Sequence, residues 1–365
     1  MVLPALKIAA LLPHVEVFGG VRRYIEIGNE FVRRGHSFTL FHPEGNAPTW
    51  LPFLGETCPF SALPQSAATS PITTSTFTAN SSSTPPSTPI TMASAAASSI
   101  PFEFDVGLCS EYSILPQFDA LNARTKFFYF VLEGHKLEKD VVRRPYRFLG
   151  NSEGICRRIE RKYGVVCGRA PGGVNPAIFH PLASPAPHDT FNILCYGRIY
   201  KRRKGVRYVI RAVEGLRRRY PRLKLIFFDT LVGGDRRDPR PMIRTSVPHD
   251  FHLNLPQGEM AALFSQADLF VSAEWRAGWS NTTAEAMACR LPVVCTPSGA
   301  LDFAEDGRTA LVAPFPFPFL LRRRIARLIG DGELRRRLAE AGFARIREFT
   351  WPRLADRLLA LFREL

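Results

Sequence analysis

A basic turn after a predicted strand has the residue types best suited to chemistry. The strand is expected at Phe191–Tyr196, and the run GRIYKRRKG follows it from Gly197 to Gly205. Arg198 and Lys204 would lie at the carboxyl end of this strand, where α/β sheets bind their ligands. Two cations there can neutralise a diphosphate leaving group, a role that a metal ion takes in other enzymes. The alternative is a solvated basic loop.

A second candidate segment runs from Ala273 to Ala288, with the sequence AEWRAGWSNTTAEAMA. We predict a helix over Thr282–Ala288, and Ser280 and Asn281 are residues typical of a helix start. The free amides of such a helix end can bind phosphate, so Ser280, Asn281 and Thr282 are candidate donor-binding residues. Glu285 could accept hydrogen bonds from a ribose diol. Thr282 and Glu285 also have the spacing of a capping box, a purely structural alternative.

A glycine pair, Gly19-Gly20, separates the first predicted strand, Leu6–Leu12, from a predicted helix. Without side chains the backbone can approach a ligand closely, and the amides and helix dipole point toward an anion. A plain tight turn would explain the pair equally well.

Strands and helices alternate in both halves of the chain, which predicts two α/β domains of the Rossmann-like type facing a cleft. In the first half, Ser152 is expected to cap a helix that runs through Arg161, and a Gly- and Pro-rich linker follows it. We expect an N-terminal domain over residues 1–175 and a C-terminal domain over 176–350. The last helix, 351–365, is expected to pack back on the N-terminal domain. The other predicted strands are Ser37–Phe41, Phe104–Cys109, Lys126–Leu132, Tyr146–Asn151, Leu223–Phe228, Leu269–Ser272 and Pro292–Thr296.

One stretch interrupts this alternation. Residues 57–102 contain no charged residue and no glycine, and more than half of them are Ser, Thr or Pro. Such a composition predicts disorder, because too little apolar surface is available to offset the entropy of ordering. Two origins remain open: a true insertion, or a reading-frame artefact bounded by compensating insertions and deletions.

The charge of the chain indicates its classes of partner, and its cysteines indicate its cellular compartment. The net charge of +15 and the pI of about 9.9 favour polyanions, namely nucleic acid, anionic lipid or a diphosphate ligand. No recognisable nucleic-acid motif accompanies the charge, so nucleic acid is not an expected partner. No apolar run is long enough for a transmembrane helix, and the start of the chain is interpreted as a strand rather than a signal peptide. The 7 cysteines show no CxxC pair, which predicts reduced thiols and a cytoplasmic protein.

These segments together resemble the retaining family-4 glycosyltransferases, the group 1 glycosyltransferases, over nearly the whole chain except residues 57–102. The resemblance implies the GT-B fold and a nucleotide-diphosphate sugar donor held mainly by the C-terminal domain. It implies that Arg198 and Lys204 contact the diphosphate, Glu285 the ribose, and Gly19-Gly20 the donor phosphate or the acceptor side. The segments that carry it are FGGVRRYIEIGNEFVRRGH, YRFLGNSEGICRRI, GGVNPAIFHP, ILCYGRIYKRRKG, ADLFVSAEWRAGWSNTTAEAMACRLPVVCTPSG and DFAEDGRTALV.

The sequence departs from the family at the first of two glutamates that the family usually separates by seven residues. Counting back from Glu285 gives Ala277, and Glu274 is the candidate substitute. The histidine that the family places near the donor sugar has His135 as its candidate, with Glu133 as a rival. The chain has no Asp-x-Asp sequence of the kind that holds a metal ion in other glycosyltransferases, so neither a metal nor a cofactor is expected.

The sequence therefore predicts a retaining hexosyl- or related glycosyltransferase that is independent of metal. Its expected acceptor is a glycan or a lipid-linked glycan, with a role in cell envelope polysaccharide biosynthesis. The protein is expected in the cytoplasm, with peripheral contact to the inner, anionic face of the membrane. Two alternatives remain: an inactive scaffold of the same fold that binds nucleotide, and a basic nucleic-acid-binding protein. The donor sugar, the base and the acceptor cannot be read from the sequence.

Overall fold

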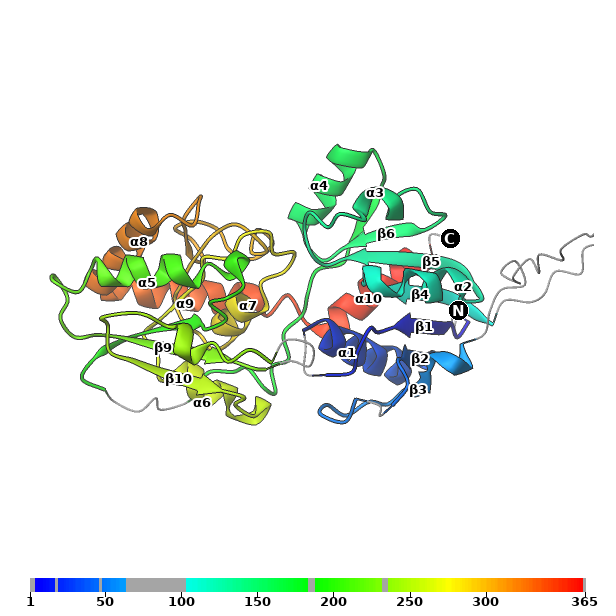
Figure 1. The fold of residues 1–365 in the computed structure, drawn as a ribbon, viewed down its shortest axis with the longest axis horizontal. Coiled ribbons are helices and arrows are strands. Elements are labelled where there is room, and N and C mark those ends of the chain that lie inside the picture. The colour runs from blue at the N-terminus through cyan, green and yellow to red at the C-terminus, as the bar shows by residue number, and fades with distance from the viewer. Residues whose placement is uncertain are drawn as a thin grey trace, which may run out of the picture.

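The computed structural model describes residues 4–16, 19–45, 48–63, 103–182, 188–231 and 236–363. Two α/β domains lie side by side, each with a sheet between layers of helices (Figure 1). This is the arrangement that the alternating pattern predicts.

The N-terminal domain is built on a parallel sheet in the order β3-β2-β1-β4-β5-β6-β7. In β1, Ile8 and Ala10 belong to one hydrophobic cluster, and Ala9 and Leu11 belong to the cluster on the other face. Burial on both faces explains why this strand is a continuous apolar run rather than an alternating one. The strands are β1 (Lys7–Leu11), β2 (Ser37–His42), β3 (Glu56–Pro59), β4 (Phe104–Cys109), β5 (Ala123–Phe130), β6 (Arg147–Gly150) and β7 (Cys167–Arg169).

Order continues into the stretch for which the sequence predicts disorder. Glu56–Pro59 form β3, which pairs in parallel with β2, and Phe60–Ala62 form a short 3-10 helix. The prediction of disorder from residue 57 is therefore wrong for its first residues, because hydrogen bonding to an existing sheet edge orders a segment that could not fold alone. Residues 64–102 of that prediction lie outside the described residues.

The C-terminal domain repeats the design with a parallel sheet in the order β10-β9-β8-β11-β12-β13. Because its strands are parallel, their carboxyl ends share one edge, and the loops that leave this edge can converge on a ligand. The strands are β8 (Phe191–Tyr196), β9 (Leu223–Asp229), β10 (His249–Leu253), β11 (Leu269–Val271), β12 (Val293–Cys295) and β13 (Leu311–Val312).

Helices cover both sheets, and local signals account for several of their ends. Ser152 accepts a hydrogen bond from the amide of Ile155 at 3.3 Å, which confirms the predicted helix cap. The helices are α1 (Gly19–Arg33), α2 (Leu115–Ala120), α3 (Glu138–Val141), α4 (Glu153–Tyr163), α5 (Val206–Glu214), α6 (Met260–Ser265), α7 (Asn281–Ala288), α8 (Pro318–Gly330), α9 (Gly332–Ile346) and α10 (Trp351–Arg363). No helix in the described ranges is long and apolar enough to cross a membrane.

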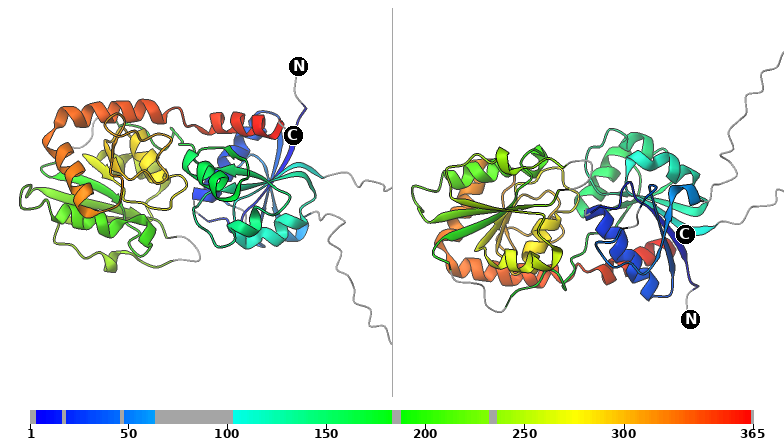
Figure 2. Two further views of the ribbon diagram at one scale, coloured as in Figure 1. Left: turned by 90° about the horizontal axis from the view of Figure 1, so that it is seen from above. Right: turned by 60° about the horizontal axis from the view of Figure 1, so that its bottom comes forward.

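The chain crosses between the domains twice. After the loop that leads to β8, it returns through α10, which packs beside α1 (Figure 2). Trp351 and Phe362 of α10 are buried in the same cluster as Phe31 of α1. A backbone bridge between Leu132 and Ala277 also joins the domains. The two domains are therefore joined by both chain crossings and by this backbone bridge.

Candidate donor-binding cleft

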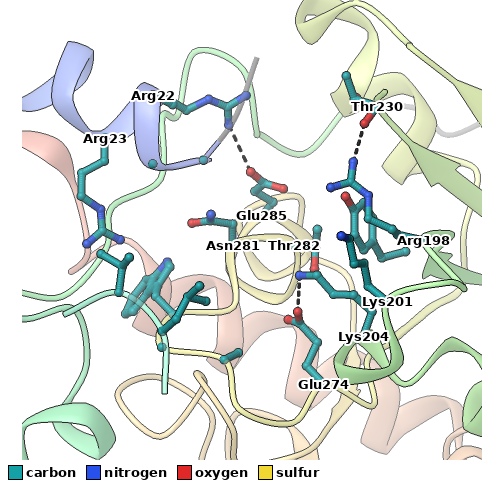
Figure 3. Close-up of a pocket in the computed structure, with 18 of the residues that line it drawn as sticks. Arg22, Arg23, Arg198, Lys201, Lys204, Thr230, Glu274, Asn281, Thr282 and Glu285 are labelled. Carbon is teal, nitrogen blue, oxygen red and sulfur yellow. Dashed lines mark hydrogen bonds and ion pairs between the residues drawn. The ribbon is translucent and has the colours of Figure 1, made fainter. Parts of the chain in front are cut away.

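A cavity of about 510 Å³ lies between the domains, and both contribute to its walls (Figure 3). Most of the side chains that line it follow the carboxyl ends of strands or belong to the first turns of the helices after them. Arg198, Lys204, Glu274, Asn281, Thr282 and Glu285 line it from the C-terminal domain, and Gly19, Gly20 and Arg22 line it from α1. The structure thus brings most of the sequence-predicted site residues to one place. Ser280 and His135 are not among the lining residues.

Arg198 is held rigidly in the wall. Its guanidinium forms an ion pair with Asp229 at the end of β9, with its Nη2 2.7 Å from Oδ1, and it also donates to the carbonyl of Thr230. The Arg198 side chain is only 9% exposed and lies over the ring of Tyr196. This buried partner fixes the position of the cation beside the cavity.

Lys204 forms an ion pair with the Oε1 atom of Glu274, and its ammonium lies 5.0 Å from the centre of the same Tyr196 ring. The other oxygen of Glu274 accepts a hydrogen bond of 2.5 Å from the hydroxyl of Ser280. Glu274 is thus engaged by Lys204 on one side and by the start of α7 on the other. The sequence predicts a catalytic role for Glu274, and these contacts also suit a carboxylate that orients Lys204.

Glu285 of α7 pairs with a residue from the other domain. Its carboxylate lies 3.2 Å from the Nη1 atom of Arg22, and the Nη2 atom of Arg22 donates to the side-chain oxygen of Gln257. Burial raises the pKa of Glu285, and the positive charge of Arg22 opposes this rise. The carboxylate faces the cavity, where it can accept hydrogen bonds from a diol.

The start of α7 differs from the capping box that its sequence allows. Ser280 is the N-cap residue but its side chain does not cap the helix, and Glu285 turns to Arg22 instead of to the helix start. A Cβ atom on Gly19 would lie 2.6 Å from the side-chain nitrogen of Asn281. The starts of α1 and α7 therefore approach each other closely, and a side chain at position 19 would displace the amide group of Asn281.

Ala277, at the position where the family usually has a glutamate, lies in the contact between the two domains. The backbone of Ala277 forms the bridge to Leu132, and a Cβ atom on Gly278 would collide with Asn151 and Val131 of the N-terminal domain. Arg276, just before them, has a left-handed φ of 63°. Ala277 therefore lies at the contact between the domains, whereas Glu274 lies beside Lys204 and Ser280.

His135, the predicted histidine, is not among the residues that line the cavity. His135 stacks on the ring of Tyr112 at 3.8 Å, and its Nδ1 atom accepts a hydrogen bond from the amide of Leu137. Burial raises the pKa of its rival, Glu133. The histidine that lines the cavity is His14, after β1, whose pKa is lowered by burial and raised in part by Glu16.

Sequence reasoning missed several residues of the N-terminal wall. Arg22 and Arg23 follow the glycine pair after one intervening residue, Val21, so their place after the first strand was the available signal. Charge on a predicted helix, however, usually indicates a solvated face. Glu111 lines the cavity after β4, and burial raises its pKa while Arg203 lowers it. Among the described residues no group of three metal-binding side chains is present.

Comparison with known proteins shows what this chain is similar to. Residues 190–331 match the family model described as glycosyl transferases group 1. A D-inositol 3-phosphate glycosyltransferase of Paenarthrobacter aurescens is 28% identical over 244 residues, which cover 62% of this chain and 59% of that protein. A second, from an Arthrobacter strain, is 33% identical over 158 residues, 39% of this chain and 37% of that protein. The chain thus spans well under two thirds of these relatives.

Two solved structures are similar to this chain over nearly its whole length. Sucrose-phosphate synthase of Thermosynechococcus elongatus superposes with a TM-score of 0.72 at 17% identity, covering 98% of both chains. Anabaena HepE, solved with UDP and glucose, gives 0.71 at 16% identity and covers 99% of this chain and 100% of its own. At these identities the likeness shows the fold alone, a two-domain Rossmann-like α/β fold of the GT-B type.

Proposed function

We propose that the chain transfers a sugar from a nucleotide-diphosphate sugar to an acceptor, because residues 190–331 match the model of the group 1 glycosyltransferases and the whole chain has the GT-B fold. The observation that carries this proposal is the arrangement of Arg198, Lys204 and Glu285 around one cavity between the domains. The two cations suit a diphosphate, and the carboxylate suits a ribose diol.

The reaction breaks the bond between the sugar and the diphosphate, and negative charge grows on the leaving oxygen. Arg198 and Lys204 are positioned before the reaction by Asp229 and Glu274, so they can stabilise this charge without reorganisation. The amides at the start of α7 add positive potential on the same wall. We propose that these groups supply the charge that a metal ion supplies in other transferases.

The finer features of the reaction rest on the family resemblance. We propose a retaining hexosyl transfer to a glycan or lipid-linked glycan, in the cytoplasm and in the service of cell envelope polysaccharide synthesis. NMR of the anomeric proton in the first product tests retention, because the donor and product then share one configuration. An inverted product would contradict it.

A thermal-shift screen against UDP, GDP, ADP and their sugars tests donor binding. Specific binding raises the apparent stability as RT ln(1 + [L]/Kd), so one nucleotide should raise the midpoint more than the others. Loss of that shift in Glu285→Gln, with the shift kept in the exposed control Arg202→Gln, supports the proposed site. No shift with any nucleotide would contradict the proposal.

An inactive nucleotide-binding scaffold is the second candidate, and Ala277 favours it. This position lacks the glutamate that the family usually has, and Glu274 is engaged elsewhere. Such a scaffold would give the thermal shift but neither hydrolyse nor transfer the bound sugar. Single-turnover assays with radiolabelled donor separate the two candidates.

We further propose that a phenylalanine ridge (Phe315, Phe317 and Phe319) docks the protein on anionic membrane. These side chains are 59%, 49% and 54% exposed, and their rings lie against one another at 5.8 and 6.1 Å. The ridge follows β13, which ends at the same sheet edge as the strands beside the cavity. In the first turns of α8, Arg322 and Arg323 are exposed and form no ion pair with a described carboxylate. Aromatic rings beside unpaired cations suit the interface of an anionic bilayer better than a polar protein surface.

A further inference from the structure

Arg23, in the first turns of α1, is a buried cation without a carboxylate partner among the described residues. It is 4% exposed, and its guanidinium lies 4.8 Å from the centre of the Tyr129 ring. Its Nε and Nη1 atoms are buried and donate no hydrogen bond to any described residue. No carboxylate of the described chain forms an ion pair with it. The contact with the Tyr129 side chain is then the main interaction that offsets the cost of burying this charge.

Two other arginines that line this cavity each have a carboxylate partner. Arg22 pairs with Glu285, and Arg198 pairs with Asp229. The carboxylate one turn along α1, Glu26, instead accepts a hydrogen bond from Asn175 at 2.8 Å. A buried charge that is neither paired nor fully hydrogen-bonded is costly, so its retention needs a counter-charge from elsewhere.

The position of Arg23 indicates where that counter-charge comes from. Arg23 lines the cavity, on the wall formed by the N-terminal domain. Figure 3 shows it across the cavity from Arg198 and Lys204, with Asn281 and Glu285 between them. The donor diphosphate is therefore already served by other cations, and a ligand that reaches Arg23 occupies the opposite part of the cavity.

We propose that Arg23 binds an anionic group, a phosphate monoester or a carboxylate, on the sugar acceptor. This inference rests on the proposed transfer function and specifies its acceptor as a charged molecule. A guanidinium forms charge-assisted hydrogen bonds with either anion, and the Nε and Nη1 atoms, which lie on different edges of the group, still lack an acceptor among the described residues. Burial strengthens these bonds and disfavours a neutral acceptor, which would leave the charge uncompensated.

The test compares the full-length protein with Arg23→Met and with Arg33→Met as a matched control. Arg33 lies on the same helix and pairs only with Glu30 at the surface. The probes are D-inositol 3-phosphate, D-glucuronate and neutral myo-inositol, each in thermal-shift titrations with and without UDP. The phosphate and carboxylate arms identify which anion the site prefers.

We expect at least one anionic probe to raise the midpoint of the wild type and of Arg33→Met. Its Kd should rise about 10- to 100-fold in Arg23→Met, while the UDP shift stays. Without ligand, Arg23→Met should be as stable as the wild type or more so, because it removes an unpaired buried charge. A structural arginine would instead leave a destabilised variant.

Two results would overturn the inference. One is an anionic probe that stabilises Arg23→Met as much as the wild type. The other is a wild type that responds to UDP but to neither anionic probe. Failure of the proposed function looks different, since UDP, GDP and ADP would then all leave the midpoint of every variant unchanged.

Discussion

Arg22 of α1 and Glu285 of α7 form an ion pair of 3.2 Å between the two domains. The carboxylate proposed to hold the donor ribose is thus oriented by a cation from the opposite domain. Side chains of 14% and 12% exposure make this pair largely buried. We therefore expect donor binding and the relative position of the domains to be coupled through this contact.

The first prediction concerns the stability of this pair. Arg22→Met leaves a buried carboxylate without its partner and should lower the free energy of unfolding by about 2–4 kcal/mol. Arg22→Met combined with Glu285→Gln should recover part of this loss, because no uncompensated charge remains. Urea denaturation of both single variants and the double variant measures the coupling. Strictly additive losses would show that the pair contributes nothing.

Lys204→Met should lower turnover about 100-fold, the usual loss when one preorganised donor to a developing negative charge is removed. Arg202→Met is the matched control, because Arg202 is exposed, does not line the cavity, and contacts Trp275 only through its backbone carbonyl. Steady-state rates with the donor found in the nucleotide screen provide the measurement. Equal rates in Lys204→Met and Arg202→Met would remove Lys204 from the mechanism.

Glu274→Gln tests whether this residue acts on the substrate or through Lys204. The structure shows its two oxygens engaged by Lys204 and Ser280, so we expect a positioning role. Turnover should fall about 10-fold or more in the single variant and should fall no further when Glu274→Gln is added to Lys204→Met. A full additional loss in the double variant would instead assign Glu274 to the reacting sugar.

The pH dependence of donor binding should report on Glu285. Burial raises its pKa above 4.5. As the pH falls, the carboxylate therefore takes up a proton earlier than an ordinary glutamate does, and donor affinity should weaken from that higher pH. By linkage, the contribution of Glu285 to the free energy of unfolding falls as the pH rises from 4.5 through the raised pKa. Calorimetric titration of UDP-sugar against pH should show this step in the wild type, and Glu285→Gln should lose it.

Vesicle binding tests the phenylalanine ridge. Serine at Phe315, Phe317 and Phe319 removes apolar contact without changing charge, and should lower partition onto vesicles with 30 mol% phosphatidylserine by about 10-fold or more. Arg322→Gln with Arg323→Gln should weaken binding mainly at low salt. Phe53→Ser, a half-buried phenylalanine of the other domain, is the control. Sedimentation that is unchanged by the triple substitution would point to another surface.

The local sequence was sufficient for the elements and for one wall of the site. Apolar runs of strand length, glycines after helices and Ser152 before α4 are signals within a few residues, so strands and helices could be placed from them. Arg198, Lys204 and Glu285 could be found because the basic turn that holds the two cations follows β8, and the helix that holds Glu285 follows β11. The order of strands in parallel sheets then places them at one edge.

What tertiary structure alone decided is which charges meet. Arg22 with Glu285 and Arg198 with Asp229 are pairs of residues far apart in the chain, and nothing local in the sequence specifies them. The same holds for the burial of Arg23 against Tyr129 and for the ordering of Glu56–Pro59 as an edge strand. Periodicity is set by neighbours along the chain, whereas burial and charge pairing depend on neighbours in space.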